Sequence, residues 1–295
     1  MEKNEKITVV TVCDTHYLIL LAALAKSIEL NHKTEEKIEL IIVEDRISAS
    51  NKRKFELGID NKVINVTWLA MSDAIPAQMH MPSDKSSYPL NIYVRVFIPW
   101  FVREDVSRVI YLDVDMIMLG DVSELWRMDI QGFPLGAVQD PRIKTADNPW
   151  GGIKNYKELG LSADTRYFNT GLLIIDTESW RKHDISQKVL ICVQRNQAYL
   201  NYPDQYALNV VLANNWFNLA DPWNHFVTSG DHIQAKIIHF VERKPIYTSY
   251  NNSKHFQNLF YSYLEQTAWK GTPKIGEVSR YLKKIKNLLS KFIKK

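Results

Sequence analysis

Two aspartates one residue apart are the clearest chemical feature of this sequence. Asp113 and Asp115 follow the apolar run Ile110-Tyr111-Leu112, which is typical of a buried strand. Because side chains alternate along a strand, both carboxylates point the same way and repel each other. Partial burial of two such charges is costly unless a cation compensates them. A divalent ion such as Mn²⁺ or Mg²⁺, completed by phosphate oxygens, is the simplest compensation, so the pair indicates a metal-bound phosphate or nucleotide.

The same pair also fits a solvated strand end or a calcium loop. Counted from Asp113, Asp115 and Glu124 occupy the third and twelfth positions of an EF-hand loop. However, Ile117 stands at a ligand position and Met118 stands where the turn needs glycine. We therefore reject the calcium loop.

The composition is that of a globular protein in a reducing compartment. The chain has 295 residues, of which 45% are hydrophobic and 24% are charged, and this length suits one large domain or two small ones. Cys13 and Cys192 lie in apolar segments and predict buried free thiols, as in a reducing cytosol. No signal peptide is evident, and the apolar stretch 17–25 is too short to span a bilayer.

The net charge of +4 is concentrated in the C-terminal tail. Seven basic residues and no acidic residue occur from Arg280 onward. A basic excess confined to a tail argues against a nucleic-acid-binding surface. The spacing of the apolar residues predicts an amphipathic helix, either docked on the body or, as we favour, lying on an anionic membrane surface. These apolar residues are Tyr281, Leu282, Ile285, Leu288, Leu289, Phe292 and Ile293.

The elements that must position the aspartates alternate between strand and helix. We expect strands at 7–12, 38–43 and 63–68, a helix over about 17–30, and a second helix capped by Ser48 or Ser50. This alternation predicts a doubly wound α/β sheet, which binds ligands at the carboxyl ends of its strands. Neither a Gly-x-Gly-x-x-Gly segment nor a phosphate loop follows the first strand, which argues against the dinucleotide-binding and P-loop classes. Long loops are expected at 74–89 and 141–152.

Five segments in the same order resemble glycosyltransferase family 8, which includes bacterial lipopolysaccharide galactosyl- and glucosyltransferases and glycogenin. The resemblance covers roughly residues 7–245. The segments are 9–17, 91–95, 111–115 with 120–126, 167–176 and 202–209.

The resemblance implies a fold, a reaction and a place of action. The fold is the α/β sandwich of the GT-A type with a mostly parallel central sheet, here over residues 1–250, followed by a helical region over 251–295. The reaction is transfer of a hexose from a UDP-sugar, UDP-glucose or UDP-galactose, to a hydroxyl of a saccharide or glycolipid acceptor, with retained configuration and with Mn²⁺ or Mg²⁺. Together with the basic tail, it implies a cytoplasmic enzyme at the inner face of the plasma membrane, acting in lipopolysaccharide or surface-glycan synthesis.

By the same resemblance, Asp113, Asp115 and His239 hold the metal ion. Lys244 contacts the phosphates. The alternative for His239 is a hydrogen-bonded histidine at a strand end without a metal role.

The resemblance also implies which residues recognise the nucleotide. The carboxylate of Asp14 accepts the uracil N–H, the ring of Tyr17 stacks on the base, and the backbone of Val12 contributes. The alternative for Tyr17 is packing at a helix start. Arg95 lies on an apolar helix and needs an anionic partner. That partner is either a structural carboxylate or, as we favour, the donor.

The resemblance implies that four residues contact the transferred sugar: Asp140, Asn169, Asp204 and Gln205. Gln205 lies near the anomeric carbon, where its carbonyl could stabilise oxocarbenium character. Because an amide is a poor nucleophile, we favour front-face attack by the acceptor hydroxyl over a covalent intermediate. The alternative for Asp204 is a helix N-cap.

The segment that follows His239 departs from the family pattern His-x-x-Gly-x-x-Lys-Pro-Trp. It reads His239-Phe240-Val241-Glu242-Arg243-Lys244-Pro245-Ile246, which is one residue shorter and lacks the glycine and the tryptophan. Arg243 is therefore a second candidate for the phosphate-binding cation.

Two rival functions stay open at this stage. A nucleotidyltransferase on a similar fold is disfavoured, because such enzymes carry a glycine-rich, basic signature after the first strand and residues 12–17 lack it. A non-catalytic membrane-binding module would not need Asp113, Asp115 and the Asp204-Gln205 pair together.

Overall fold

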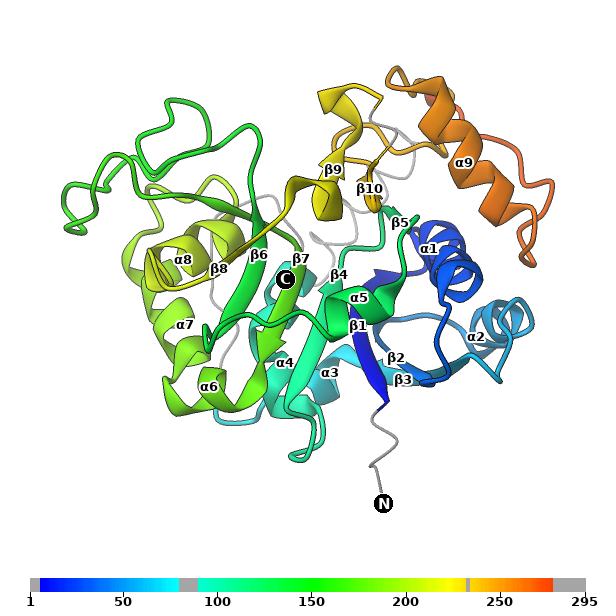
Figure 1. Cartoon of the computed structure of the whole chain (residues 1–295), viewed down its shortest axis with the longest axis horizontal. Coiled ribbons are helices and arrows are strands. Elements are labelled where there is room, and N and C mark those ends of the chain that lie inside the picture. The colour runs from blue at the N-terminus through cyan, green and yellow to red at the C-terminus, as the bar shows by residue number, and fades with distance from the viewer. Residues whose placement is uncertain (1–5, 80–89, 232–233, 278–295) are drawn as a thin grey trace, which may run out of the picture.

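A seven-stranded sheet forms the centre of the protein, as the computed structural model shows for residues 6–79, 90–231 and 234–277 (Figure 1). Its strands lie in the order β3-β2-β1-β4-β7-β6-β8. β7 is antiparallel to both of its neighbours, β4 and β6, whereas the other neighbouring pairs are parallel. The strands are β1 (Ile7–Asp14), β2 (Ile38–Asp45), β3 (Ile64–Ala70), β4 (Arg108–Leu112), β6 (Leu135–Gln139), β7 (Phe168–Asp176) and β8 (Phe217–Leu219).

The predicted α/β class and the mostly parallel sheet are confirmed. The three expected strands are β1, β2 and β3, and the expected helices are α1 (Leu18–Asn31) and α2 (Ala49–Glu56). Ser48 is the residue that caps α2, because its side chain accepts a hydrogen bond from the N–H of Asn51 at 3.3 Å. The predicted tail helix lies outside the described residues, as does most of the loop expected at 74–89.

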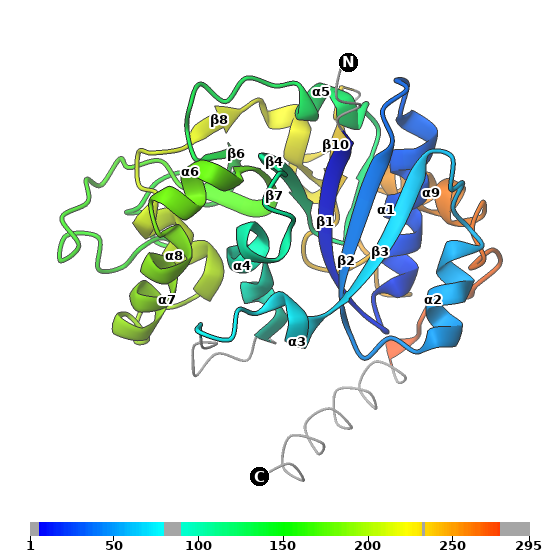
Figure 2. The same ribbon diagram turned by 90° about the horizontal axis from the view of Figure 1, so that it is seen from below.

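Helices cover both faces of the sheet (Figure 2). Val9 and Val10, adjacent on β1, are both fully buried and lie on opposite faces of the sheet, so the strand packs against a core on each side. Val9 belongs to the core formed with α1, and Val10 belongs to the core that contains Phe97 of α4 (Val94–Phe101). The other helices are α3 (Met71–Ala74), α5 (Val122–Trp126), α6 (Thr177–Lys182), α7 (Ile185–Arg195), α8 (Pro203–Val211), α9 (Lys254–Leu264) and the 3₁₀ turns η1 (Leu90–Tyr93), η2 (Asp221–Asn224) and η3 (Val227–Ser229).

A second, three-stranded sheet begins directly after β4. It consists of β5 (Met116–Met118), β10 (Ile237–His239) and β9 (His225–Phe226), with β10 in the middle. β10 is antiparallel to β5 and parallel to β9. The turn 113–115 therefore joins the two sheets, and it carries the Asp-x-Asp pair.

Helix α9 packs against α1 through the first hydrophobic core, to which Phe256, Phe260 and Leu264 belong. The division into 1–250 and 251–295 stays a prediction. Within the described part of the chain, every helix is too short or too polar to cross a bilayer.

Candidate active site

Asp113, Asp115 and His239 meet where the two sheets join. One ligand atom from each residue lies within 4.8 Å of the others. Asp113 and Asp115 lie in the turn after β4 rather than in the strand itself, and the pairing of β10 with β5 places His239 opposite Met116. Two carboxylate oxygens and an imidazole nitrogen suit Mn²⁺ and related divalent ions.

A chain of hydrogen bonds fixes the tautomer of His239. The backbone N–H of Gly171 donates to Oδ1 of Asn169 at 2.9 Å, which identifies that atom as oxygen. Nδ2 of Asn224 therefore donates to the same oxygen at 2.8 Å, and Oδ1 of Asn224 faces Nδ1 of His239 at 2.9 Å. Because Asn224 offers an acceptor there, Nδ1 carries the proton, and Nε2 presents its lone pair 3.4 Å from Oδ1 of Asp115.

Gly171 makes room for this histidine on the neighbouring strand β7. A Cβ atom at Gly171 would lie 2.6 Å from Cε1 of His239 and 2.8 Å from Cε of Met116. The close approach, the tautomer and the donor set together fit a divalent cation held by Asp113, Asp115 and His239.

Lys244, and not Arg243, reaches the acidic pair. Its Nζ contacts Oδ2 of Asp115 and donates to the carbonyl of Phe240 at 2.8 Å. Burial would raise the pKa of Asp115, but the ammonium group of Lys244 opposes this rise and holds that pKa well below its usual range. Arg243 instead has its guanidinium carbon 5.9 Å from the ring centre of Tyr247 and its Nη1 4.0 Å from Oε1 of Glu277.

The shortened loop keeps the backbone conformation that glycine would provide. Glu242 stands at the glycine position of the family pattern, and its φ is 62°. A residue other than glycine in this left-handed region is strained by about 1–2 kcal/mol. Its side chain pairs with Arg142 at 2.6 Å.

Arg95 lies between two carboxylates. Its Nη2 lies 3.0 Å from Oδ1 of Asp113, and its Nε lies 3.1 Å from Oδ2 of Asp204. It also donates to the carbonyl of Thr170 at 2.7 Å. Arg95 thus has structural carboxylate partners, and it also lines both of the cavities described next.

A cavity of about 480 Å³ extends from the acidic pair toward α8. Asn169, Asp204, Gln205 and Asp140 all line it. Nδ2 of Asn169 donates to Oε1 of Gln205 at 3.1 Å and to Oδ2 of Asp140 at 3.3 Å. Oε1 of Gln205 also accepts from the backbone N–H of Thr170 at 3.1 Å, so the amide is held in one orientation.

Asp204 is the second residue of α8 and not its N-cap, which is Tyr202. Burial raises the pKa of Asp204, and Arg95 opposes that rise. Because the N-cap of α8 is Tyr202, the capping alternative for Asp204 is wrong.

A smaller cavity of about 310 Å³ lies on the other side of the acidic pair. Val12, Asp14 and Tyr17 line it, together with Asp115 and Lys244. Oδ1 of Asp14 accepts from the backbone N–H groups of His16 and Tyr17 at 2.8 and 2.9 Å, which fixes the start of α1. The two cavities share Ile92, Arg95, Asp113 and Lys244, so Asp113 lies where they adjoin.

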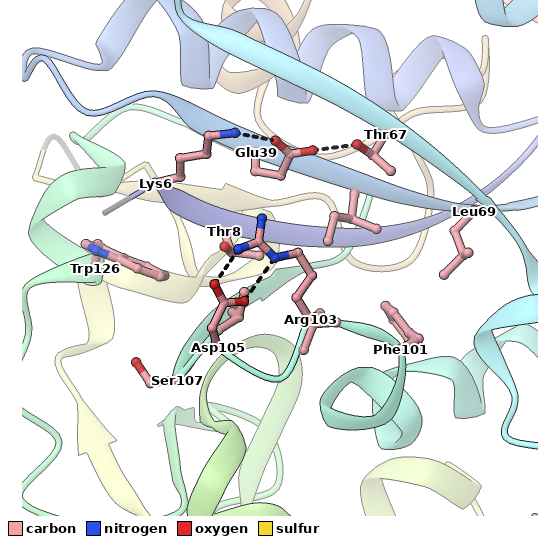
Figure 3. A pocket seen from close by; sticks show the side chains of 13 residues that line it. Lys6, Thr8, Glu39, Thr67, Leu69, Phe101, Arg103, Asp105, Ser107 and Trp126 are labelled. Carbon is pink, nitrogen blue, oxygen red and sulfur yellow. Dashed lines mark hydrogen bonds and ion pairs between the residues drawn. The ribbon is translucent and has the colours of Figure 1, made fainter. Parts of the chain in front are cut away.

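A third cavity, of about 630 Å³, shares no lining residue with these two. It lies over one face of β1–β3, beside the segment 101–107 that follows α4 (Figure 3). Its charged groups are paired with each other: Glu39 with Lys6, and Arg103 with Asp105. It is therefore separate from the Asp113–Asp115–His239 cluster and from the two cavities beside that cluster.

All twelve site residues expected from the sequence lie around these two adjoining cavities. Sequence reasoning missed Asn224 and Tyr247. Asn224 lies in a 3₁₀ turn without a motif, and only its contact with His239 identifies it. Tyr247 lies beside the residues that precede α1, with its hydroxyl 2.7 Å from Nε2 of His16.

Comparison with known proteins gives a consistent result. The profile described as "Glycosyl transferase family 8" matches residues 8–254. General stress protein A of Bacillus subtilis (strain 168) is 28% identical over 94% of this chain and all of that protein. Glycosyltransferase GlyF of Streptococcus pneumoniae serotype 4 is 28% identical over 75% of this chain and 49% of that protein.

Two solved structures share the fold. Galactosyltransferase LgtC in complex with donor and acceptor sugar analogues has a TM-score of 0.71 at 20% identity, over 90% of this chain and 99% of that one. The bifunctional glycosyltransferase WbbM has a TM-score of 0.75 at 18% identity, over 92% of this chain and 51% of that one. The chain thus spans the whole of general stress protein A and about half of GlyF and WbbM.

Proposed function

The chain belongs to glycosyltransferase family 8, and on that premise we propose that it is a retaining enzyme that uses a UDP-hexose. The donor is UDP-glucose or UDP-galactose, and the acceptor is a hydroxyl of a saccharide or glycolipid. The observation that carries this proposal is the position of the Asp113–Asp115–His239 cluster beside two cavities. We call the cavity of about 310 Å³ at Asp14 the nucleotide-side cavity and the cavity of about 480 Å³ at Gln205 the sugar-side cavity.

The three cluster residues would hold Mn²⁺ or Mg²⁺. When bound, such an ion stabilises the negative charge that develops on a diphosphate leaving group. Lys244, which lines both cavities, would contact the same phosphates. Asp14 and Tyr17 would recognise the base, together with the backbone of Val12.

On the sugar side, Asp140 and Asn169 would bind hydroxyls of the hexose. Gln205, next to Asp204, would face the anomeric carbon. The acceptor oxygen attacks that carbon from the face that the diphosphate leaves: the bond from carbon to the phosphate oxygen breaks, and the bond to the acceptor oxygen forms. The acceptor proton passes to the departing diphosphate. Trapping of a glycosyl-enzyme adduct by mass spectrometry would contradict this front-face route.

The test is UDP release from a panel of UDP-sugars, with Mn²⁺ and with EDTA. Asp115→Ala removes one proposed ligand, and Asp73→Ala is the control, since Asp73 is exposed at α3 and lines neither site cavity. We expect one donor to be hydrolysed slowly with Mn²⁺. This activity should be lost with EDTA and in Asp115→Ala, and it should be kept in Asp73→Ala. Release of UDP from no donor would contradict a transferase, and equal release in EDTA would contradict the metal requirement.

We further propose that the tail after Ser279 binds the inner face of the bacterial membrane, where lipid-linked glycans of the lipopolysaccharide type are extended. Each basic residue near an anionic surface contributes about 1 kcal/mol. A chain truncated after Ser279 should lose binding to phosphatidylglycerol vesicles and keep turnover of soluble acceptors. Undiminished vesicle binding by the truncated chain would refute membrane attachment through the tail.

A further inference from the structure

An exposed tryptophan stands at the mouth of the sugar-side cavity. Trp150 is 54% exposed, yet it lines the same cavity as the buried Asp140 and Gln205. Its ring lies against that of Tyr202, with the ring centres 6.2 Å apart and the planes at 69°. An indole that is left in water at a cavity mouth is a typical ligand-contact surface.

The turn that carries Trp150 is closely packed and hydrogen-bonded. Gly151 has a φ of 80°, and a Cβ there would lie 2.4 Å from Cδ1 of Ile143. Gly152 has no room for a Cβ either, because the carbonyl of Asn148 would lie 2.4 Å from it. Asn148 also donates from its side chain to the carbonyl of Trp150 at 2.7 Å. The backbone that carries the indole is therefore fixed by packing at the mouth of the cavity before any ligand binds.

The partly exposed Arg142 and the exposed Glu242 line the same cavity. Arg142 pairs with Glu242 at 2.6 Å and donates to Oγ1 of Thr228 at 2.9 Å. The backbone N–H of Arg142 also donates to Oδ1 of Asp140 at 2.8 Å, which ties this wall to the inner end of the cavity.

The mouth thus combines a flat aromatic surface with hydrogen-bonding side chains. A pyranose ring has the matching chemistry, because its C–H face is apolar and its hydroxyl edge is polar. A purely apolar ligand would cover the Arg142–Glu242 ion pair without hydrogen-bonding to it, and an anionic ligand would gain little from the electron-rich face of the indole.

We propose that Trp150 and Tyr202 form the acceptor subsite and that the neutral sugar ring bearing the attacking hydroxyl stacks on Trp150. This inference rests on the proposed function, and it names the acceptor as a glycoside. The donor hexose occupies the inner, buried end near Asp140 and Gln205, so an acceptor at the mouth has its hydroxyl directed inward.

The experiment measures transfer from the active UDP-hexose to methyl β-galactoside, methyl β-glucoside and lactose. These probes carry no aromatic aglycone, so any stacking must involve the sugar. The variants are Trp150→Ala and Trp150→Phe, and Leu57→Ala is the control, since Leu57 is 86% exposed and lines neither cavity. Initial rates at varied acceptor and varied donor concentration separate the two KM values.

We expect Trp150→Ala to raise the acceptor KM about tenfold, as loss of one anchoring aromatic contact does, with a much smaller change in the donor KM. Trp150→Phe should recover most of the loss, and Leu57→Ala should match the wild type. An unchanged acceptor KM in Trp150→Ala would overturn the inference. So would transfer to a serine-containing peptide with none to the three glycosides. If the wild type releases no UDP from any donor, the proposed function itself fails, which is a different result.

Discussion

Asn224 accepts a hydrogen bond from Nδ1 of His239 at 2.9 Å, and this contact determines which nitrogen of the ring faces the acidic pair. The contact links Asn169 on β7 to His239 on β10 through one buried amide. Nothing else about Asn224 suggests a role in the site, since it is buried and lies outside every motif of the family pattern.

Replacing Asn224 should therefore weaken metal binding without removing a ligand. We expect Asn224→Ala to lower the affinity for Mn²⁺ by roughly 10–100-fold, the usual effect of losing a hydrogen bond to a ligating histidine. Calorimetric titration with Mn²⁺ alone measures this. Asn155→Ala is the control: Asn155 is an equally buried amide bonded to Asn196, away from both cavities. Equal Mn²⁺ affinities of wild type and Asn224→Ala would contradict the tautomer assignment.

Arg95 should be a large contributor to stability because two carboxylates depend on it. Arg95→Leu leaves Asp204 buried with its main cationic partner removed, and we expect a loss of about 3–5 kcal/mol in the free energy of unfolding. Urea denaturation measures the change. The control is Arg103→Leu, which breaks the exposed Arg103–Asp105 pair and should leave the midpoint unchanged. Similar midpoints for the two variants would show that Arg95 has no structural role.

Glu242 offers a test of the loop that departs from the family pattern. Because its φ is 62°, Glu242→Gly should be more stable than Glu242→Ala by about 1 kcal/mol, although both lose the pair with Arg142. Lys188, which is exposed in α7, is the matched control, and there we expect the opposite order of stability of the glycine and alanine variants. There the alanine variant should be more stable than the glycine variant by about 1 kcal/mol. An alanine advantage at both sites would mean that Glu242 is not in the left-handed region.

The two thiols should be unreactive in the folded protein. Burial raises the pKa of Cys192 to about 11, and it raises the pKa of Cys13 well above its ordinary value. The reactive species is the thiolate, so neither thiol should react with a disulfide reagent near pH 8, about where unfolded thiols begin to ionise. In guanidinium chloride both should react. Since the folded state favours the protonated thiols, this contribution to stability is complete below the unfolded pKa of about 8.5 and is lost as the pH rises toward 11. Rapid reaction of either thiol in the native protein would contradict its burial.

The parts of the fold that the sequence predicts are those with strong local signals. The apolar runs of β1, β2 and β3 and the cap at Ser48 identify their elements without tertiary information. The family assignment from five short segments is confirmed. The antiparallel direction of β7 is not readable in the same way, because its apolar residues are buried on both faces whichever way the strand runs.

The site shows the same limit. Residue type and position indicated Asp113 and Asp115, but the shortened segment after His239 left Arg243 as a second candidate beside Lys244 for the phosphate-binding cation. The choice depends on the turn at Glu242, whose φ is a property of the folded loop. Trp150 and Asn224 belong to no local sequence motif. Their roles depend on contacts with residues about 50 or more positions away: Trp150 contacts Tyr202, and Asn224 contacts Asn169.

The position of β7 between β4 and β6 has a consequence for how the protein is made. β6 leaves the ribosome before β7, but it can join the sheet only after β7 has paired with β4. His239 and Lys244 come later still, so the cluster cannot form on a partial chain. During synthesis the first three strands can assemble early, whereas the sugar-side cavity must wait for nearly the whole chain. Refolding should accordingly restore the α1 core before it restores metal binding, and a chain that ends before β10 should contain much of the sheet and no metal site.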